Sequence, residues 1–270
     1  MRNLGCNTAP FSGNSIEQNM ETIKKVGFNC TSFDWNESLD MEKIMLKATE
    51  LNLEVESIKA PFEDINCIWE EGTEGDYYTE KLRCCIKDAA KYKIPYVIMQ
   101  TTVTNSAPKT SHIALIRFGK LVREAEKQGI KILFKNAEFF RHLSLVLYSF
   151  KSGNVGFCYD IGQEVCYTPG LKYLSQFSNR LLCTIFSDND GFPNSKIVTS
   201  EADHHKIPFD GSIDFNKICI DIKNCGYTGS IMLEVYNQES LDFYKDMTME
   251  QFYSKAYSAA VKLSEIIDGD

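Results

Sequence analysis

The chain contains 270 residues, of which 43% are hydrophobic and 24% are charged. This composition supports a sizeable core and excludes a disordered or collagen-like chain. The formal charge of −8 argues against nucleic acid as a partner, because a nucleic-acid-binding protein needs a basic face. We expect neither a secretory signal nor a membrane span, since no apolar stretch approaches about 18 residues.

Ten cysteines are scattered along the sequence, and no C-x-x-C pair occurs. Without an export signal, we expect reduced thiols that pack as small hydrophobic side chains in a cytoplasmic protein. The spacing therefore argues against a disulfide-stapled domain and against a zinc finger.

Short β-type segments alternate with longer helical segments about eight times along the chain. The first strand, 3–8, precedes a helix that begins at Asn14 or Ser15 and ends at Gly27. Further strands are expected at 28–33, 54–59, 96–100, 130–135, 155–159, 180–187 and 230–235, and further helices at 38–50, 76–91, 111–127, 138–150, 214–224 and 249–267. A long loop separates the seventh strand from the helix that begins near residue 214.

This alternation predicts parallel strands, because each helix then serves as the crossover between two neighbouring strands. Eight such units without a linker favour one α/β domain over 1–270, a single-domain (β/α)8 TIM barrel. An open, doubly wound sheet is less favoured, since no G-x-G-x-x-G motif follows the first strand.

Four charged side chains stand where predicted strands end: Lys59, Lys135, Asp160 and Glu234. In such barrels the catalytic groups lie at the C-terminal ends of the strands, so we expect these four at one mouth. Buried charges are costly unless they are paired, so the four are either bonded to one another or functional. The other strand ends carry Asn7, Asp34, Gln100 and Ser187.

Six segments after the predicted strands form an ordered set. They are K-A-P-F at 59–62 with Asn66 and Trp69, K-N at 135–136, C-Y-D-I-G-Q at 158–163, D-N-D-G at 188–191, D-H-H at 203–205 with G-S-I-D-F at 211–215, and G-Y-T-G at 226–229 with L-E-V at 233–235. Over nearly the whole chain this set resembles the xylose isomerase-like barrels, the sugar phosphate isomerase/epimerase superfamily. The resemblance implies a small carbohydrate or sugar phosphate as partner and a divalent metal (Mn, Mg, Zn or Co) as cofactor.

The same comparison shows that two of the family's four metal-ligand positions are replaced. Asp160 and Glu234 match ligands, whereas Lys135 stands at a glutamate position and Ile185 at a histidine position. A divalent cation prefers several oxygen or imidazole ligands, so these residues favour a degenerate metal site. Three neighbouring histidine positions of the family are also replaced, by Lys59, Gln100 and Gln163.

We interpret Lys59 and Lys135 as taking the place of the metal's positive charge between the two carboxylates. If the protein is an enzyme, Glu234 is the predicted base and Lys135 its acid or electrophile, in a proton transfer next to a carbonyl. The alternative is a catalytically inactive ligand-binding or regulatory barrel. The predicted substrate-binding residues are Lys59, Asn66, Trp69, Gln100, Asp160, Gln163, Asp188 and His205.

Two weaker hypotheses concern the loops. Asp203, His204 and His205 are candidates for a loop metal site, and an apolar wall for a sugar ring is a second hypothesis. The sequence leaves the sugar and any homo-oligomeric state open. The wall would consist of Phe11, Trp35, Phe62 and Trp69.

Overall fold

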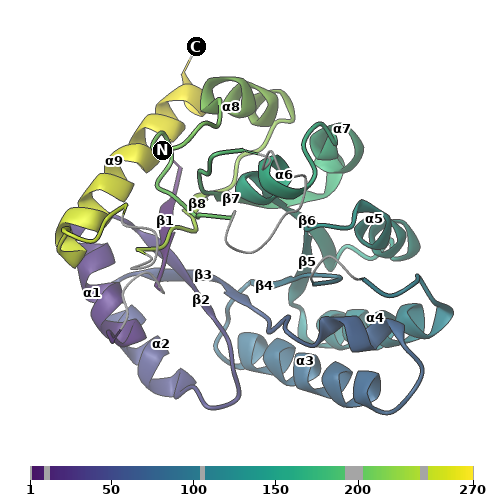
Figure 1. Cartoon of the computed structure of the whole chain (residues 1–270). Coiled ribbons are helices and arrows are strands. Elements are labelled where there is room, and N and C mark those ends of the chain that lie inside the picture. The colour runs from purple at the N-terminus through teal and green to yellow at the C-terminus, as the bar shows by residue number, and fades with distance from the viewer. Residues whose placement is uncertain (1, 9–12, 104–106, 192–202, 238–242, 270) are drawn as a thin grey trace.

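Eight parallel strands close into a barrel (Figure 1). The computed structural model describes residues 2–8, 13–103, 107–191, 203–237 and 243–269. Within them the strands pair in chain order, and β8 pairs with β1, so the predicted single-domain barrel is confirmed. The strands are β1 (Leu4–Asn7), β2 (Cys30–Asp34), β3 (Glu54–Lys59), β4 (Tyr96–Met99), β5 (Lys131–Lys135), β6 (Val155–Asp160), β7 (Leu181–Phe186) and β8 (Ile231–Leu233).

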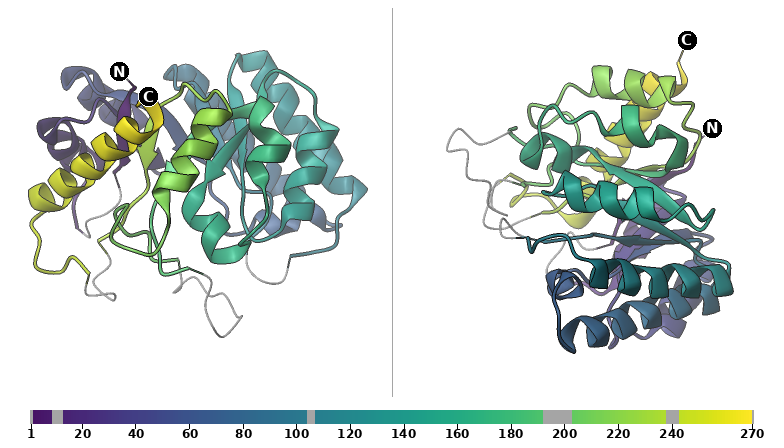
Figure 2. Two further views of the ribbon diagram at one scale, coloured as in Figure 1. Left: turned by 90° about the horizontal axis from the view of Figure 1, so that it is seen from above. Right: turned by 90° about the vertical axis from the view of Figure 1, so that its right-hand side faces the viewer.

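Helices surround the barrel on its outside (Figures 1 and 2). The major ones are α1 (Ile16–Val26), α2 (Met41–Glu50), α3 (Glu74–Lys91), α4 (His112–Gln128), α5 (Phe140–Ser149), α8 (Phe215–Asn224) and α9 (Met249–Asp268). Ser15, not Asn14, caps α1, in a capping box with Gln18. Among the described residues, no helix combines the length and the apolar character needed to cross a membrane. All ten cysteines lie in the described part of the chain as free thiols.

Several short helices lie in segments for which the sequence pattern predicted no helix. They are too short for a 3.6-residue periodicity to identify. The start of α6 depends on a side chain, because the Asp160 carboxylate accepts a hydrogen bond from the Gln163 backbone N–H. Glycine suits position 162, next to this cap, since a Cβ there would force Ser187 Oγ to move. These helices are η1 (Ile65–Trp69), α6 (Ile161–Tyr167), α7 (Tyr173–Phe177) and η2 (Ser178–Arg180).

The alternation of side chains along the strands determines which residues face the inside of the barrel. Five side chains of β4 to β7 pack in an apolar cluster of their own, the inner cluster: Ile98, Leu133, Cys158, Cys183 and Ile185. The residues between them, such as Phe134 and Phe157, belong to the main core against the helices. Lys135 and Asp160 are two residues beyond Leu133 and Cys158, so their side chains share the inner face, at the C-terminal end of the barrel.

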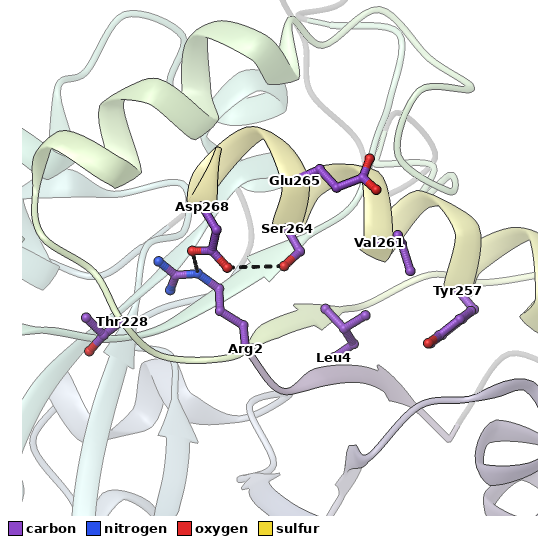
Figure 3. A pocket seen from close by; sticks show the side chains of 8 residues that line it. All are labelled: Arg2, Leu4, Thr228, Tyr257, Val261, Ser264, Glu265 and Asp268. Atoms are coloured by element: carbon purple, nitrogen blue, oxygen red, sulfur yellow. Dashed lines mark hydrogen bonds and ion pairs between the residues drawn. The ribbon is translucent and has the colours of Figure 1, made fainter. Parts of the chain in front are cut away.

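At the N-terminal end of the strands, an open groove of about 840 Å³ lies between β1 and α9 (Figure 3). The Arg2 guanidinium lies in it, 2.6 Å from the Asp268 carboxylate. Arg2 also donates hydrogen bonds to the carbonyls of Tyr227 and Gly229. The charged groups at this end thus connect the first strand to the last helix.

A buried arginine organises the loop that follows β3. Arg117 of α4 is 1% exposed. Its guanidinium donates to the carbonyl oxygens of Cys67, Ile68, Glu70 and Gly72 and pairs with the Asp76 carboxylate at 3.2 Å. This one side chain therefore satisfies the backbone of η1 and of the turn before α3.

We predict that Arg117→Met lowers the free energy of unfolding by about 3–5 kcal/mol, because it leaves four carbonyl groups without their donor and removes the buried cation that pairs with Asp76. Urea unfolding followed by circular dichroism measures this. Lys120→Ala is the matched control. The partly exposed Lys120 lies 3.4 Å from the same Asp76 carboxylate and should contribute only about 0–1 kcal/mol. Equal losses in the two variants would contradict the organising role of Arg117.

Candidate active site

Two ammonium groups and two carboxylates meet at the C-terminal mouth of the barrel. Lys59, Lys135 and Asp160 are the last residues of β3, β5 and β6, and Glu234 directly follows β8. Both lysines lie within ion-pair distance of the carboxylates, as the sequence predicted. One ion pair thus joins the ends of β3 and β8, and the other joins the ends of β5 and β6.

The first pair is completely buried. Lys135 Nζ lies 2.9 Å from Asp160 Oδ2, and the side chains are 4% and 0% exposed. Asp160 Oδ1 accepts from the Gln163 N–H, and the backbone of Asp160 exchanges two hydrogen bonds with the Asn136 amide. Burial alone would lower the pKa of Lys135, but the charges of Asp160 and Glu234 outweigh burial and raise it. Lys135 is therefore an ammonium ion at neutral pH.

The second pair centres on Lys59. Its Nζ lies 2.8 Å from Asp34 Oδ1, 2.9 Å from Glu234 Oε1 and 3.3 Å from the Tyr236 hydroxyl, which itself donates to Glu234 Oε1 at 3.1 Å. Three partners use all three N–H groups of the ammonium. Burial would raise the pKa of Glu234, but Lys59, Lys135 and His205 outweigh burial and hold it well below its usual range. Glu234 is therefore a carboxylate at neutral pH.

His205 adds a third cation to the site. Its Nδ1 lies 3.1 Å from the Glu234 carbonyl oxygen, and its Nε2 lies 3.4 Å from Asp203 Oδ2. Burial opposes the charged ring, but Asp203 outweighs burial and raises the pKa of His205 to about 9. The imidazolium thus donates from both nitrogens. His205 has a φ of 45°, a strained value for a residue other than glycine, as is common at functional sites.

Several predicted substrate-binding residues are engaged elsewhere in the fold. Asn66 exchanges two hydrogen bonds with the backbone of Val103, and Trp69, 2% exposed, donates from its indole N–H to the Thr101 carbonyl. Both side chains fasten η1 to the loop after β4, so this packing does not support a direct contact with a sugar. Asp188 accepts four backbone N–H groups, those of Asn189, Phe209, Gly211 and Ile213, and so organises the loop after β7.

The other predicted residues lie closer to the pairs. Gln163 lies in the first turn of α6 beside Asp160, and its buried side-chain oxygen has no hydrogen-bond partner among the described residues. Gln100 directly follows β4 and is partly exposed. Their contacts with a substrate stay predictions.

The burial of the two tryptophans does not support the apolar-wall hypothesis. Trp35 is 3% exposed and donates to Asp88, and Trp69 packs edge-on against Phe118 and His142. Phe62 is 40% exposed, and Phe11 lies outside the described residues. The sequence analysis missed Tyr236; its only signal was a polar aromatic residue two positions after Glu234.

Comparisons with known proteins identify the family. The family model described as xylose isomerase-like TIM barrel matches residues 20–251, and the chain belongs to that family. The uncharacterized protein y4fM of Sinorhizobium fredii (strain NBRC 101917 / NGR234) is 27% identical over 202 residues, which cover 70% of this chain and 60% of that protein.

Two solved structures share the fold. A D-tagatose 3-epimerase-like protein has 18% identity and a TM-score of 0.77, with 98% of each chain covered. The IOLI protein, whose structure holds a zinc atom, has 16% identity and a TM-score of 0.81, with 97% of this chain and 98% of that chain covered. At these identities, the likeness shows the fold alone.

The residues at this mouth do not fit the divalent metal that the family implies. Asp160 and Glu234 are each already bound to an ammonium group. Ile185, which the sequence resemblance places at a ligand position, is 1% exposed inside the apolar inner cluster. Throughout the described ranges, no group of three or more His, Cys, Asp or Glu side chains is arranged to hold a metal ion, which does not support the Asp203, His204 and His205 hypothesis. A dication would have to displace two ammonium ions from their carboxylates.

We predict that the purified protein holds no stoichiometric transition metal and that its melting temperature neither rises with added Mn²⁺ or Zn²⁺ nor falls with EDTA. A specific site would add about 2.7 kcal/mol of stability at a metal concentration 100-fold above Kd. Elemental analysis and melting curves measure this. One equivalent of metal whose stabilisation disappears in Asp160→Asn would show that the ion pairs open for a cation and would contradict this prediction.

Proposed function

We propose that this chain is a sugar isomerase/epimerase that moves a proton next to the carbonyl of a small carbohydrate at the barrel mouth, with lysine in place of a metal. The observation that carries the proposal is a difference between the two lysines. Lys59 has three partners, whereas Lys135 has, among the described residues, only the Asp160 carboxylate at 2.9 Å. A buried ammonium with two N–H groups left over is suited to a ligand oxygen.

Lys135 suits the role of electrophile better than that of nucleophile. Its raised pKa keeps the amine protonated, so it cannot attack a carbonyl carbon. A buried cation stabilises negative charge on a carbonyl oxygen far more strongly than an exposed one, because the surroundings screen it less. Lys135 would therefore bind the carbonyl oxygen and pass a proton between it and the neighbouring hydroxyl oxygen.

Glu234 suits the role of base on geometric grounds. Its described side-chain contacts, with Lys59 and Tyr236, both fall on Oε1, so Oε2 is the oxygen for the substrate C–H group. Its lowered pKa keeps the carboxylate charged but weakens it as a base, since the best catalytic pKa lies near the working pH. We therefore expect slow turnover unless the substrate loosens the Lys59 contact.

Aldose–ketose isomerisation fits the carboxylates better than epimerisation does. Both oxygens of Asp160 are occupied, by Lys135 and by the Gln163 N–H. Glu234 would then act alone, on one face of the substrate: it takes the proton from one carbon and returns it to the next. Epimerisation through an acid and a base on opposite faces would need a second carboxylate that is available.

A non-catalytic binding or regulatory barrel is the second candidate. The observation that favours it is that Asp160 and Glu234 both form ion pairs with lysines. Carboxylates held in this way could accept hydrogen bonds from hydroxyl groups without taking up a proton. Under either candidate, we propose a small carbohydrate, free or phosphorylated, as the ligand. The ten free thiols support the further proposal of a cytoplasmic location.

We predict that the wild-type protein incorporates deuterium from heavy water into at least one sugar of a panel of aldoses, ketoses and their phosphates. Glu234→Gln should lose about 10²- to 10⁴-fold of this exchange, the usual contribution of a general base. Mass spectrometry of the recovered sugars measures it. Glu250→Gln, which removes a surface carboxylate paired with Lys25, is the control and should exchange like the wild type.

Exchange that survives Glu234→Gln would exclude Glu234 as the base. An absence of exchange with every sugar, together with binding detected by calorimetry, would favour the non-catalytic barrel.

A further inference from the structure

Tyr236 contacts Lys59, Glu234 and His205. Its backbone N–H donates to the His205 carbonyl at 3.0 Å, and its ring packs edge-on against the His205 ring with centroids 4.7 Å apart. Its hydroxyl lies between the Lys59 ammonium, at 3.3 Å, and Glu234 Oε1, at 3.1 Å. Contacts thus hold the backbone, the ring and the hydroxyl of Tyr236.

The hydroxyl is a donor toward one specific oxygen. Lys59 has hydrogens only to donate, so the phenol oxygen accepts from Lys59 and directs its own hydrogen to Glu234. Oε1 therefore receives two hydrogen bonds, one from a cation and one from a neutral group. Rotation of the carboxylate would break both of them at once.

We propose that Tyr236 is a positioning residue for Glu234: together with Lys59 it holds Oε1 and so presents Oε2 to the ligand. The identity of the reaction rests on the proposed isomerase function, but the positioning itself does not. Lys59 alone could not fix the carboxylate in this way, because an ammonium ion on a flexible stem can follow a rotating oxygen, whereas the phenol of a ring packed against His205 cannot.

The test is Tyr236→Phe, which keeps the ring against His205 and removes only the hydroxyl. Crystal structures of this variant and of the wild type under the same conditions should show the Glu234 carboxylate rotated or split over two conformers in the variant. A carboxylate that stays in place and well ordered would overturn the proposal, whether or not the protein is an enzyme.

Kinetics give the second readout. With a sugar that the wild type turns over, Tyr236→Phe should lower kcat about 10- to 100-fold, the equivalent of one hydrogen bond to a charged group, with KM nearly unchanged. Tyr227→Phe is the matched control, because it removes a buried hydroxyl that donates to the Ser230 carbonyl at the opposite end of β8, and its kcat should be that of the wild type. Equal kcat losses in the two variants would indicate general loosening and overturn the proposal. If the wild type turns over no sugar, the proposed function fails, and the crystal structures alone decide the role of Tyr236.

Discussion

The site depends on the neutralisation of two buried carboxylates by two lysine ammonium groups. Taking one such ion out of water costs several kcal/mol, and an ion left without its partner makes the fold unstable. Asp160 and Glu234 are 0% and 6% exposed, and each has an ammonium group within 2.9 Å. Because the four residues terminate β3, β5, β6 and β8, the same charges that satisfy one another also fix the relative positions of four strand ends.

The two lysines contribute equal charge but differ in how many N–H groups they leave available to a ligand. Lys59 is saturated by Asp34, Glu234 and Tyr236, so it acts as a clamp, whereas Lys135 keeps donors that no described residue accepts. A metal ion would offer its open coordination positions at one point between the carboxylates. Under the proposed function, the two lysines would divide that role: Lys59 would hold the Glu234 carboxylate, and Lys135 would offer its remaining N–H groups to a ligand oxygen.

The barrel and the four charges could be predicted from the sequence because both follow from periodicity. The hydrophobic pattern repeats differently in strands and in helices, which identifies the elements. A charged residue at the C-terminal end of a strand in a closed barrel then lies at the mouth. The structural contacts of Asn66 and Trp69 could not be predicted, because their position after a strand did not reveal that the loops after β3 and β4 bond to each other. Helix α6 was missed because its start depends on the Asp160 cap and on contact with Ser187. Tyr236 could not be found by pattern, because two of its partners, Lys59 and His205, are distant in sequence.

The inner cluster below the site has a consequence for where protons can go. Ile98, Leu133, Cys158, Cys183 and Ile185 are all at most 3% exposed, and they pack the β4 to β7 side of the barrel beneath Lys135 and Asp160 with side chains of which only the two thiols carry an exchangeable hydrogen. A hydrogen removed from a bound ligand would meet mostly apolar packing on this side of the barrel, so the mouth is the expected route to bulk water. The ratio of hydrogen returned to the ligand to hydrogen lost to solvent would then compare the rate of proton return with the rate of exchange through the mouth.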